Sequence, residues 1–261
     1  MPHRPVRNFT DAVCQPFFLE GKEHNGKTHG VLVLHGFTGT IAHMRLIAQK
    51  LNQQGFTVMG VNLPGHGTTM DDMAACTWQD WLDAAKEAFL RLKERCDYVS
   101  VAGLSMGGCL SLMIGEQMQP TAIAPISAPM GTRMPLWMAM LARPILPTIW
   151  WKTRSEDAAM VDERYDYGYP GFRSSCARHL SRLIQTARRD LHAVTCPILV
   201  VQSRADTTIT ADSAEVIVKG VSSQRKGILW LKDVPHVCTI SREAENIAAA
   251  LAEHFRQAEN A

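Results

Sequence analysis

Short apolar runs alternate along the chain with longer segments of helical periodicity. Gly30–Leu34 is apolar on both faces, which is typical of a buried strand of a parallel sheet. A helix is predicted to begin after Thr77, because Thr77 and Asp80 have the spacing of a capping box. The same alternation predicts strands at 57–61, 98–102, 122–126, 198–202 and 227–231, and helices at 41–53, 106–117, 211–218 and 244–255.

The alternation stops between residues 127 and 191, a stretch that is rich in proline and aromatic residues. It resumes at Ile198 and continues to the C-terminus. We therefore expect an α/β fold, with a mostly parallel sheet flanked by helices, made of residues 1–126 and 192–261. Residues 127–191 are expected to form a mainly helical cap over one end of the sheet, with a helix around 177–191 as its last element.

Composition narrows the classes of partner. The 261 residues include 27 Lys and Arg against 25 Asp and Glu, so no basic field for nucleic acid is expected. The most apolar stretch, 134–151, contains three prolines and Arg143, which excludes a stable membrane insertion there. Seven cysteines without a C-x-x-C pair, and an N-terminus without a secretory apolar run, predict a cytoplasmic protein with reduced thiols.

The pentapeptide Gly103-Leu-Ser-Met-Gly107 has the form G-x-S-x-G and lies between a predicted strand and a predicted helix. So sharp a turn places its central residue at positive φ, and small neighbours are then needed to avoid collisions. The turn would hold the Ser105 hydroxyl above the sheet at a helix N-terminus. Ser105 is therefore predicted to be a nucleophile rather than an idle turn serine.

A serine nucleophile needs a base to take its proton and an acid to orient that base. Asp206 follows the strand ending at Gln202, at the edge of the sheet where α/β sites collect. His236 follows the last predicted strand by a short loop, and we expect it to be the base. The rivals are His254, expected to be a surface residue of the last helix, and Asp233, which is too near His236 to lie on a separate strand end.

Acyl transfer also needs two donors directed at the oxyanion of the tetrahedral intermediate. The Met106 backbone N–H at the start of the helix is expected to supply one. The turn His35-Gly-Phe-Thr-Gly39, directly after the first apolar strand, can supply the second from the Phe37 backbone N–H. His35 and His66 are expected to brace their loops. No zinc, dinucleotide or nucleotide motif is present, so neither a metal nor a cofactor is expected.

These motifs resemble those of the α/β-hydrolase superfamily, in particular its bacterial carboxylesterase and monoacylglycerol lipase branch. The resemblance rests on HGFTG at 35–39, PGHG at 64–67, GLSMGG at 103–108, CPILVVQSRAD at 196–206 and PHV at 235–237. It implies the same roles for Ser105, Asp206 and His236, and for the two oxyanion amides. Pro235, where a small residue is usual, and the Asp-Thr-Thr-Ile-Thr stretch after the acid both depart from the family pattern.

Large apolar side chains crowd between residues 130 and 151, more than a small cap can bury within itself. Trp137, Met138 and Met140 are expected to line a space above Ser105 that receives an apolar acyl chain. A role in the cap's own core, or weak docking onto a micelle surface, stays open.

The predicted activity is hydrolysis of carboxylic esters with an apolar acyl group. Thioesters, lactones or C–C bonds are alternative substrates for the same three residues. A non-catalytic receptor for a hydrophobic ligand is an alternative of another class.

Overall fold

The computed structural model describes residues 8–133, 136–141, 145–151 and 159–259; side chains are described for all of these except 139 and 140. Its main sheet has seven strands in the order β1-β3-β2-β4-β5-β8-β9, and only β1 is antiparallel to its neighbour. The strands are β1 Phe17–Leu19, β2 His29–Leu34, β3 Thr57–Val61, β4 Tyr98–Leu104, β5 Ala122–Ile126, β8 Ile198–Ser203 and β9 Lys226–Leu231. The expected α/β class, with a mostly parallel sheet, is confirmed.

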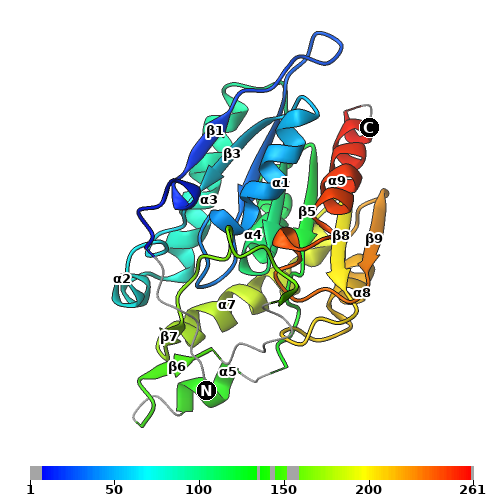
Figure 1. The fold of residues 1–261 in the computed structure, drawn as a ribbon. Coiled ribbons are helices and arrows are strands. Elements are labelled where there is room, and N and C mark those ends of the chain that lie inside the picture. Colours follow the sequence, from blue (N-terminus) through cyan, green and yellow to red (C-terminus); the bar gives the residue numbers. More distant parts are fainter. Residues whose placement is uncertain (1–7, 134–135, 142–144, 152–158, 260–261) are drawn as a thin grey trace.

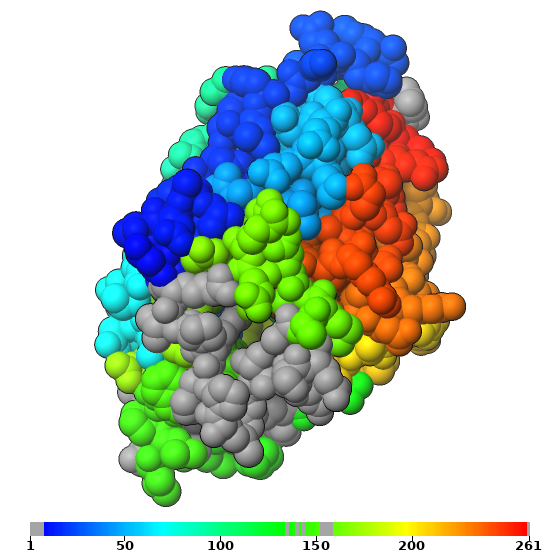
Figure 2. Space-filling view, viewed as in Figure 1, coloured from blue at the N-terminus to red at the C-terminus, as the bar shows by residue number. Residues whose placement is uncertain are grey.

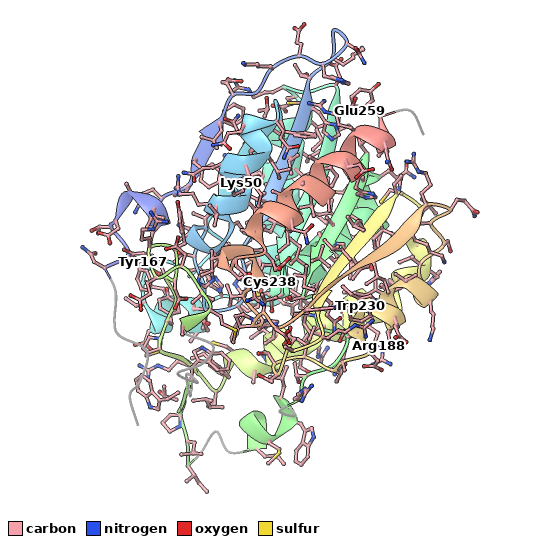
Figure 3. All side chains as sticks on the ribbon, turned by 45° about the vertical axis from the view of Figure 1, so that its right-hand side comes forward. Lys50, Tyr167, Arg188, Trp230, Cys238 and Glu259 are labelled. Atoms are coloured by element: carbon pink, nitrogen blue, oxygen red, sulfur yellow. The ribbon has the colours of Figure 1, made fainter. Side chains whose placement is uncertain are left out.

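Helices cover both faces of this sheet (Figure 1). One hydrophobic cluster joins the sheet to α1 and α9, and the other joins it to α3, α4, α7 and α8. Lys50 of α1, labelled in Figure 3, forms an ion pair with Glu245 of α9. This ion pair connects the two helices of one face. The helices flanking the sheet are α1 Ala42–Gln53, α3 Trp78–Lys93, α4 Met106–Met118, α8 Ser213–Gly220 and α9 Ala244–Ala258.

The expected cap region contains α5 Leu136–Leu141, β6 Thr148–Trp150, β7 Gly171–Arg173 and α7 Cys176–Arg189. Strands β6 and β7 pair antiparallel, and the region lies on the carboxyl-end side of the sheet, below α4 in Figure 1. Its last helix, α7, packs in the same hydrophobic cluster as α4. Among the helices that the structure describes, none combines the length and the apolar character needed to cross a membrane.

Several local elements match the sequence closely. The predicted capping box opens α3, where Thr77 Oγ1 accepts from the Asp80 N–H and the Asp80 carboxylate accepts from the Thr77 N–H. Helix α8, in contrast, begins at Ser213 rather than Ala211. The Gln202 side chain explains the shift, because it donates to the Ala211 carbonyl and accepts from the Ala214 N–H.

The remaining short elements had no clear signal in the hydropathy pattern. They are β1, the pair β6 and β7, α2 Met70–Ala75 and the 3-10 turns Ala12–Cys14, Leu191–Ala193 and Cys238–Ile240. Helix α2 is capped by Thr69, whose hydroxyl accepts from the Asp72 N–H. The other elements are only three residues long, too short for a period to be recognised.

Candidate active site

Ser105 lies in the turn between β4 and α4, with φ +54° and ψ −113°. The predicted positive φ is therefore confirmed. The turn is crowded enough to need glycine on both sides. A Cβ on Gly103 would lie 2.0 Å from the Gly107 carbonyl oxygen, and one on Gly107 would lie 2.4 Å from the Leu34 carbonyl oxygen.

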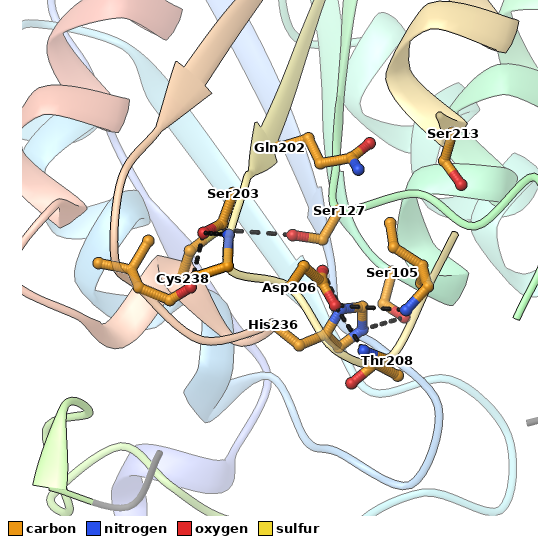
Figure 4. Close-up of polar contacts among 12 residues, drawn as sticks. Ser105, Ser127, Gln202, Ser203, Asp206, Thr208, Ser213, His236 and Cys238 are labelled. Atoms are coloured by element: carbon orange, nitrogen blue, oxygen red, sulfur yellow. Dashed lines mark hydrogen bonds and ion pairs between the residues drawn. The ribbon is translucent and has the colours of Figure 1, made fainter. Parts of the chain in front are cut away.

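The structure brings together the three residues expected to carry the chemistry (Figure 4). His236 Nε2 lies 2.8 Å from Ser105 Oγ, and His236 Nδ1 lies 2.6 Å from Asp206 Oδ2. Each residue comes from a loop at the carboxyl end of a different strand, β4, β8 or β9. Since Nδ1 donates to the carboxylate, Nε2 is free to take a proton from the serine hydroxyl.

Asp206 is held as an ionised acid. It is only 2% exposed, and its second oxygen accepts from the backbone N–H groups of Thr208 and Ile209 at 2.8 and 3.3 Å. Burial alone would raise the pKa of Asp206, but the facing His236 and these two N–H donors together lower it below its usual value. The unusual Thr-Thr-Ile stretch thus supplies the donors that stabilise the carboxylate.

Ser203 connects the acid loop to the base loop, a role that the sequence did not reveal. Its hydroxyl donates to the Val234 carbonyl at 2.6 Å and accepts from the Ala205 N–H at 3.2 Å. The bond fixes the peptide that precedes Pro235, just before His236. The sequence signal for this contact is that the apolar strand β8 ends in two polar residues, Gln202 and Ser203.

Asp233 and His254, the rival acid and base, do not take part in the contacts of Ser105, Asp206 and His236. Asp233 lies at φ +48°, and its backbone carbonyl accepts from Arg242, while the His236 imidazole contacts Asp206 instead. His254 is half-buried rather than a freely exposed residue of the last helix. Its Nε2 atom is buried, and burial lowers the pKa of His254 to about 4.

His35 braces the turn that follows β2, as expected. Its Nε2 accepts from the Leu63 N–H at 3.0 Å, so Nδ1 carries the proton and donates to the Gly36 carbonyl at 2.9 Å. His66 is also buried, with Nδ1 3.1 Å from the Pro64 carbonyl oxygen. Burial lowers the pKa of His35 to about 4 and that of His66 to about 3, so both are neutral braces.

The two expected oxyanion donors lie on turns that touch. A Cβ on Gly36 would lie 3.3 Å from Ser105 Cβ. The Gly36 carbonyl also accepts from the Gly39 N–H at 3.2 Å. The Gly36 C=O and the Phe37 N–H belong to one trans peptide, so the Phe37 N–H points away from Gly39. Met106 is the first residue of α4, and its N–H has no acceptor within that helix.

The three residues expected to bind an acyl chain lie on α5, in the cap. Trp137 is 57% exposed and Met138 is 51% exposed, and the side chain of Met140 lies outside the described ones. Across the described ranges, no group of three or more His, Cys, Asp or Glu side chains has the arrangement of a metal site.

Comparisons with known proteins agree with this architecture. Residues 27–243 match the family described as serine aminopeptidase, S33. The chain is 33% identical over 244 residues to a thermostable monoacylglycerol lipase of Bacillus sp. (strain H-257), covering 93% of this chain and 94% of the lipase. It is 26% identical over 234 residues to a carboxylesterase of Bacillus subtilis (strain 168), covering 88% and 92%.

A solved structure from work on two metagenome-derived lipolytic enzymes, LipS and LipT, superposes with a TM-score of 0.86 at 32% identity. The match covers 94% of this chain and 98% of that one. The resemblance seen in the motifs thus extends along almost the whole chain. The chain belongs to the serine aminopeptidase S33 family of α/β-hydrolases, with bacterial esterases and monoacylglycerol lipases as relatives.

Proposed function

We propose that this chain hydrolyses carboxylic esters with Ser105 as nucleophile, His236 as general base and Asp206 as the acid that orients it. The observation that carries the proposal is the continuous hydrogen-bonded path from Asp206 Oδ2 through the imidazole to Ser105 Oγ, with contacts of 2.6 and 2.8 Å. The family description names a peptidase, but relatives that match nearly the full chain are a lipase and a carboxylesterase, which favours esters.

The reaction follows from this geometry. His236 Nε2 takes the hydroxyl proton as Ser105 Oγ attacks the ester carbonyl, and the backbone N–H groups of Phe37 and Met106 stabilise the oxyanion. The resulting imidazolium faces the buried Asp206 carboxylate and then protonates the leaving alcohol. Water, deprotonated by the same imidazole, attacks the acyl-enzyme and releases the acid. These steps use only the chain's own residues.

The direct test compares turnover of p-nitrophenyl butyrate with turnover of an amino-acid p-nitroanilide. We expect ester hydrolysis by the wild type, and a loss of kcat by about three orders of magnitude or more in Ser105→Ala, His236→Ala and Asp206→Asn. His254→Ala is the matched control for His236→Ala and should keep the wild-type kcat. Turnover of the anilide alone, or full activity in His236→Ala, would contradict the proposal.

The acyl group is proposed to be apolar and to contact the cap. Nearly all of the large apolar side chains that are exposed in the described part of the chain belong to residues 137–160, with Leu90 as the exception. Each substrate methylene buried there would add about 0.8 kcal/mol, so kcat/KM should rise several-fold per methylene. Trp137→Ala and Met138→Ala should flatten that rise while leaving p-nitrophenyl acetate unaffected. A wild-type profile that is flat from acetate to laurate would contradict the acyl site.

A reducing, cytoplasmic location is proposed on the state of the thiols. All seven cysteines are thiols, and four of them are fully buried in the hydrophobic clusters or beside them. Cys238, for example, lies beside the site with its sulfur 3.7 Å from Ser127 Oγ (Figure 4). Compartments that oxidise thiols favour paired cysteines instead.

A further inference from the structure

The cap is hydrogen-bonded to the turn that carries the Phe37 backbone N–H. Cap residues 167–169 run beside residues 38–40, and the Tyr169 N–H donates to the Thr38 carbonyl at 2.8 Å. In Figure 2 this yellow-green part of the chain lies between the blue N-terminal residues and the orange residues near 240. The turn is therefore fixed from the core on one side and from the cap on the other.

Side chains make a second connection between the cap and the turn. Trp151 Nε1–H donates to Thr38 Oγ1 at 3.1 Å, and the Thr38 hydroxyl donates to the Phe37 carbonyl at 2.6 Å. The direction of this path is fixed, because an indole N–H can only donate and a hydroxyl can both accept and donate. Each bond in such a chain strengthens the next one.

The backbone conformation of Thr38 indicates a functional role for its hydroxyl. Thr38 lies at φ +63°, a conformation that is costly for a β-branched residue and free for glycine. Such strain persists only where the surrounding structure imposes it, and it is concentrated at functional sites. Thr38 is also only 4% exposed, so its hydroxyl is held away from water.

Ring packing supports the same connection. The Trp151 ring lies 5.1 Å from the Phe172 ring, and Phe172 lies 5.2 Å from the Phe37 ring in an edge-to-face contact. The backbone N–H of Trp151 donates to the Pro170 carbonyl at 2.9 Å, so the Trp151 backbone is fixed as well. Trp151 thus reaches the turn by a hydrogen bond and through the intervening Phe172 ring.

We propose that Thr38 and Trp151 are positioning residues for the oxyanion donor. They fix the Phe37 carbonyl, and with it the backbone whose N–H receives the oxyanion, so the cap contributes to the chemical step for every ester. This contribution is separate from any binding of the acyl chain. The inference rests on the proposed function, because it assigns Phe37 its part in ester hydrolysis.

Three substitutions separate the hydrogen bonds from packing. Trp151→Phe removes the indole donor and keeps an aromatic ring, Thr38→Val removes the hydroxyl and keeps the shape, and Thr38→Ser keeps the hydroxyl. With p-nitrophenyl acetate, whose acyl group is too small to probe an acyl site, we expect kcat to fall about tenfold in the first two variants. KM should stay within about twofold, and Thr38→Ser should retain most of the activity.

A second readout tests the oxyanion itself. A trifluoromethyl ketone forms a tetrahedral adduct with the active serine, and its affinity should fall by the same factor as kcat. The double variant Trp151→Phe/Thr38→Val should fall no further than either single variant, because both act through one hydroxyl.

The control is Trp150→Phe, the same change at the neighbouring residue of β6, which should keep the wild-type kcat. Wild-type kcat in Thr38→Val and Trp151→Phe, a change in KM alone, or an equal loss in Trp150→Phe would overturn the inference. A wild type that neither hydrolyses esters nor reacts at Ser105 with a fluorophosphonate would instead overturn the proposed function.

Discussion

Ser105 occupies a backbone conformation that suits glycine better than serine. At φ +54° and ψ −113° its Cβ is crowded by the chain, a cost of order 1–3 kcal/mol. Its N–H donates to the Ile126 carbonyl at 2.7 Å, and its carbonyl accepts from the Cys109 N–H, so both ends of the residue are fixed. The strain holds the hydroxyl above the sheet, where His236 can reach it.

This conflict predicts opposite effects on activity and on stability. Ser105→Gly and Ser105→Ala should both be inactive, but the glycine variant should have a free energy of unfolding higher by about 1 kcal/mol, since only alanine keeps the crowded Cβ. Urea unfolding of the two variants measures this difference. An alanine variant as stable as the glycine variant would show that the turn is not strained.

At the scale of elements, the strand–turn–helix around Ser105 was readily predicted because its signal is local. The G-x-S-x-G spacing, the apolar strand before it and the helix after it lie within about twenty residues. Asp206 and His236 were predicted in the same way, from the ends of strands. The start of α8 depends on side-chain hydrogen bonds from Gln202, and the partial burial of His254 depends on distant parts of the chain; no periodicity reveals either.

The same turn predicts which glycines can be replaced. In Gly103→Ala the new methyl would overlap the backbone of Gly107, so the turn that carries Ser105 should be displaced and activity should be lost. Gly227→Ala in β9 is the control, because its nearest neighbour would be 3.8 Å away, an ordinary contact. Esterase activity and the unfolding midpoint check both variants. An active Gly103→Ala enzyme would contradict the geometry described for the turn at Ser105.

For the whole molecule, buried ionisable groups determine how stability depends on pH. Burial lowers the pKa of His29, His35 and His254 to about 4 and that of His66 to about 3, whereas their unfolded value is 6.5. Below pH 6.5 the unfolded chain therefore binds more protons than the folded one, and stability falls as the pH decreases. Glu116 acts in the opposite direction, because burial raises its pKa to about 8 from 4.5.

The combination predicts a maximum of stability near pH 7. Between pH 6.5 and 5, four histidines opposed by one carboxyl group give a loss of up to about 4 kcal/mol per pH unit. Above pH 7, Glu116 is the group of these five whose protonation differs most between the two states, and stability declines more slowly up to pH 8. Urea unfolding at pH 5, 7 and 8 measures both effects.

Glu116→Gln isolates the alkaline side, because both carboxyl oxygens of Glu116 are buried without a hydrogen-bond partner among the described residues. The variant should lose the decline above pH 7 and keep the decline in acid. A wild type equally stable at pH 5 and 7, or an unchanged alkaline decline in the variant, would contradict this assignment.

The most direct test of the central claim is the covalent labelling of Ser105 by a fluorophosphonate, followed by peptide mass spectrometry. Ser105 Oγ is the serine oxygen that lies 2.8 Å from His236 Nε2, at the end of the path from Asp206. We predict one label per chain, on Ser105 alone, with loss of ester hydrolysis in proportion to labelling and no label in His236→Ala on the same timescale. A stoichiometric label on another serine, with Ser105 unmodified, would contradict the account.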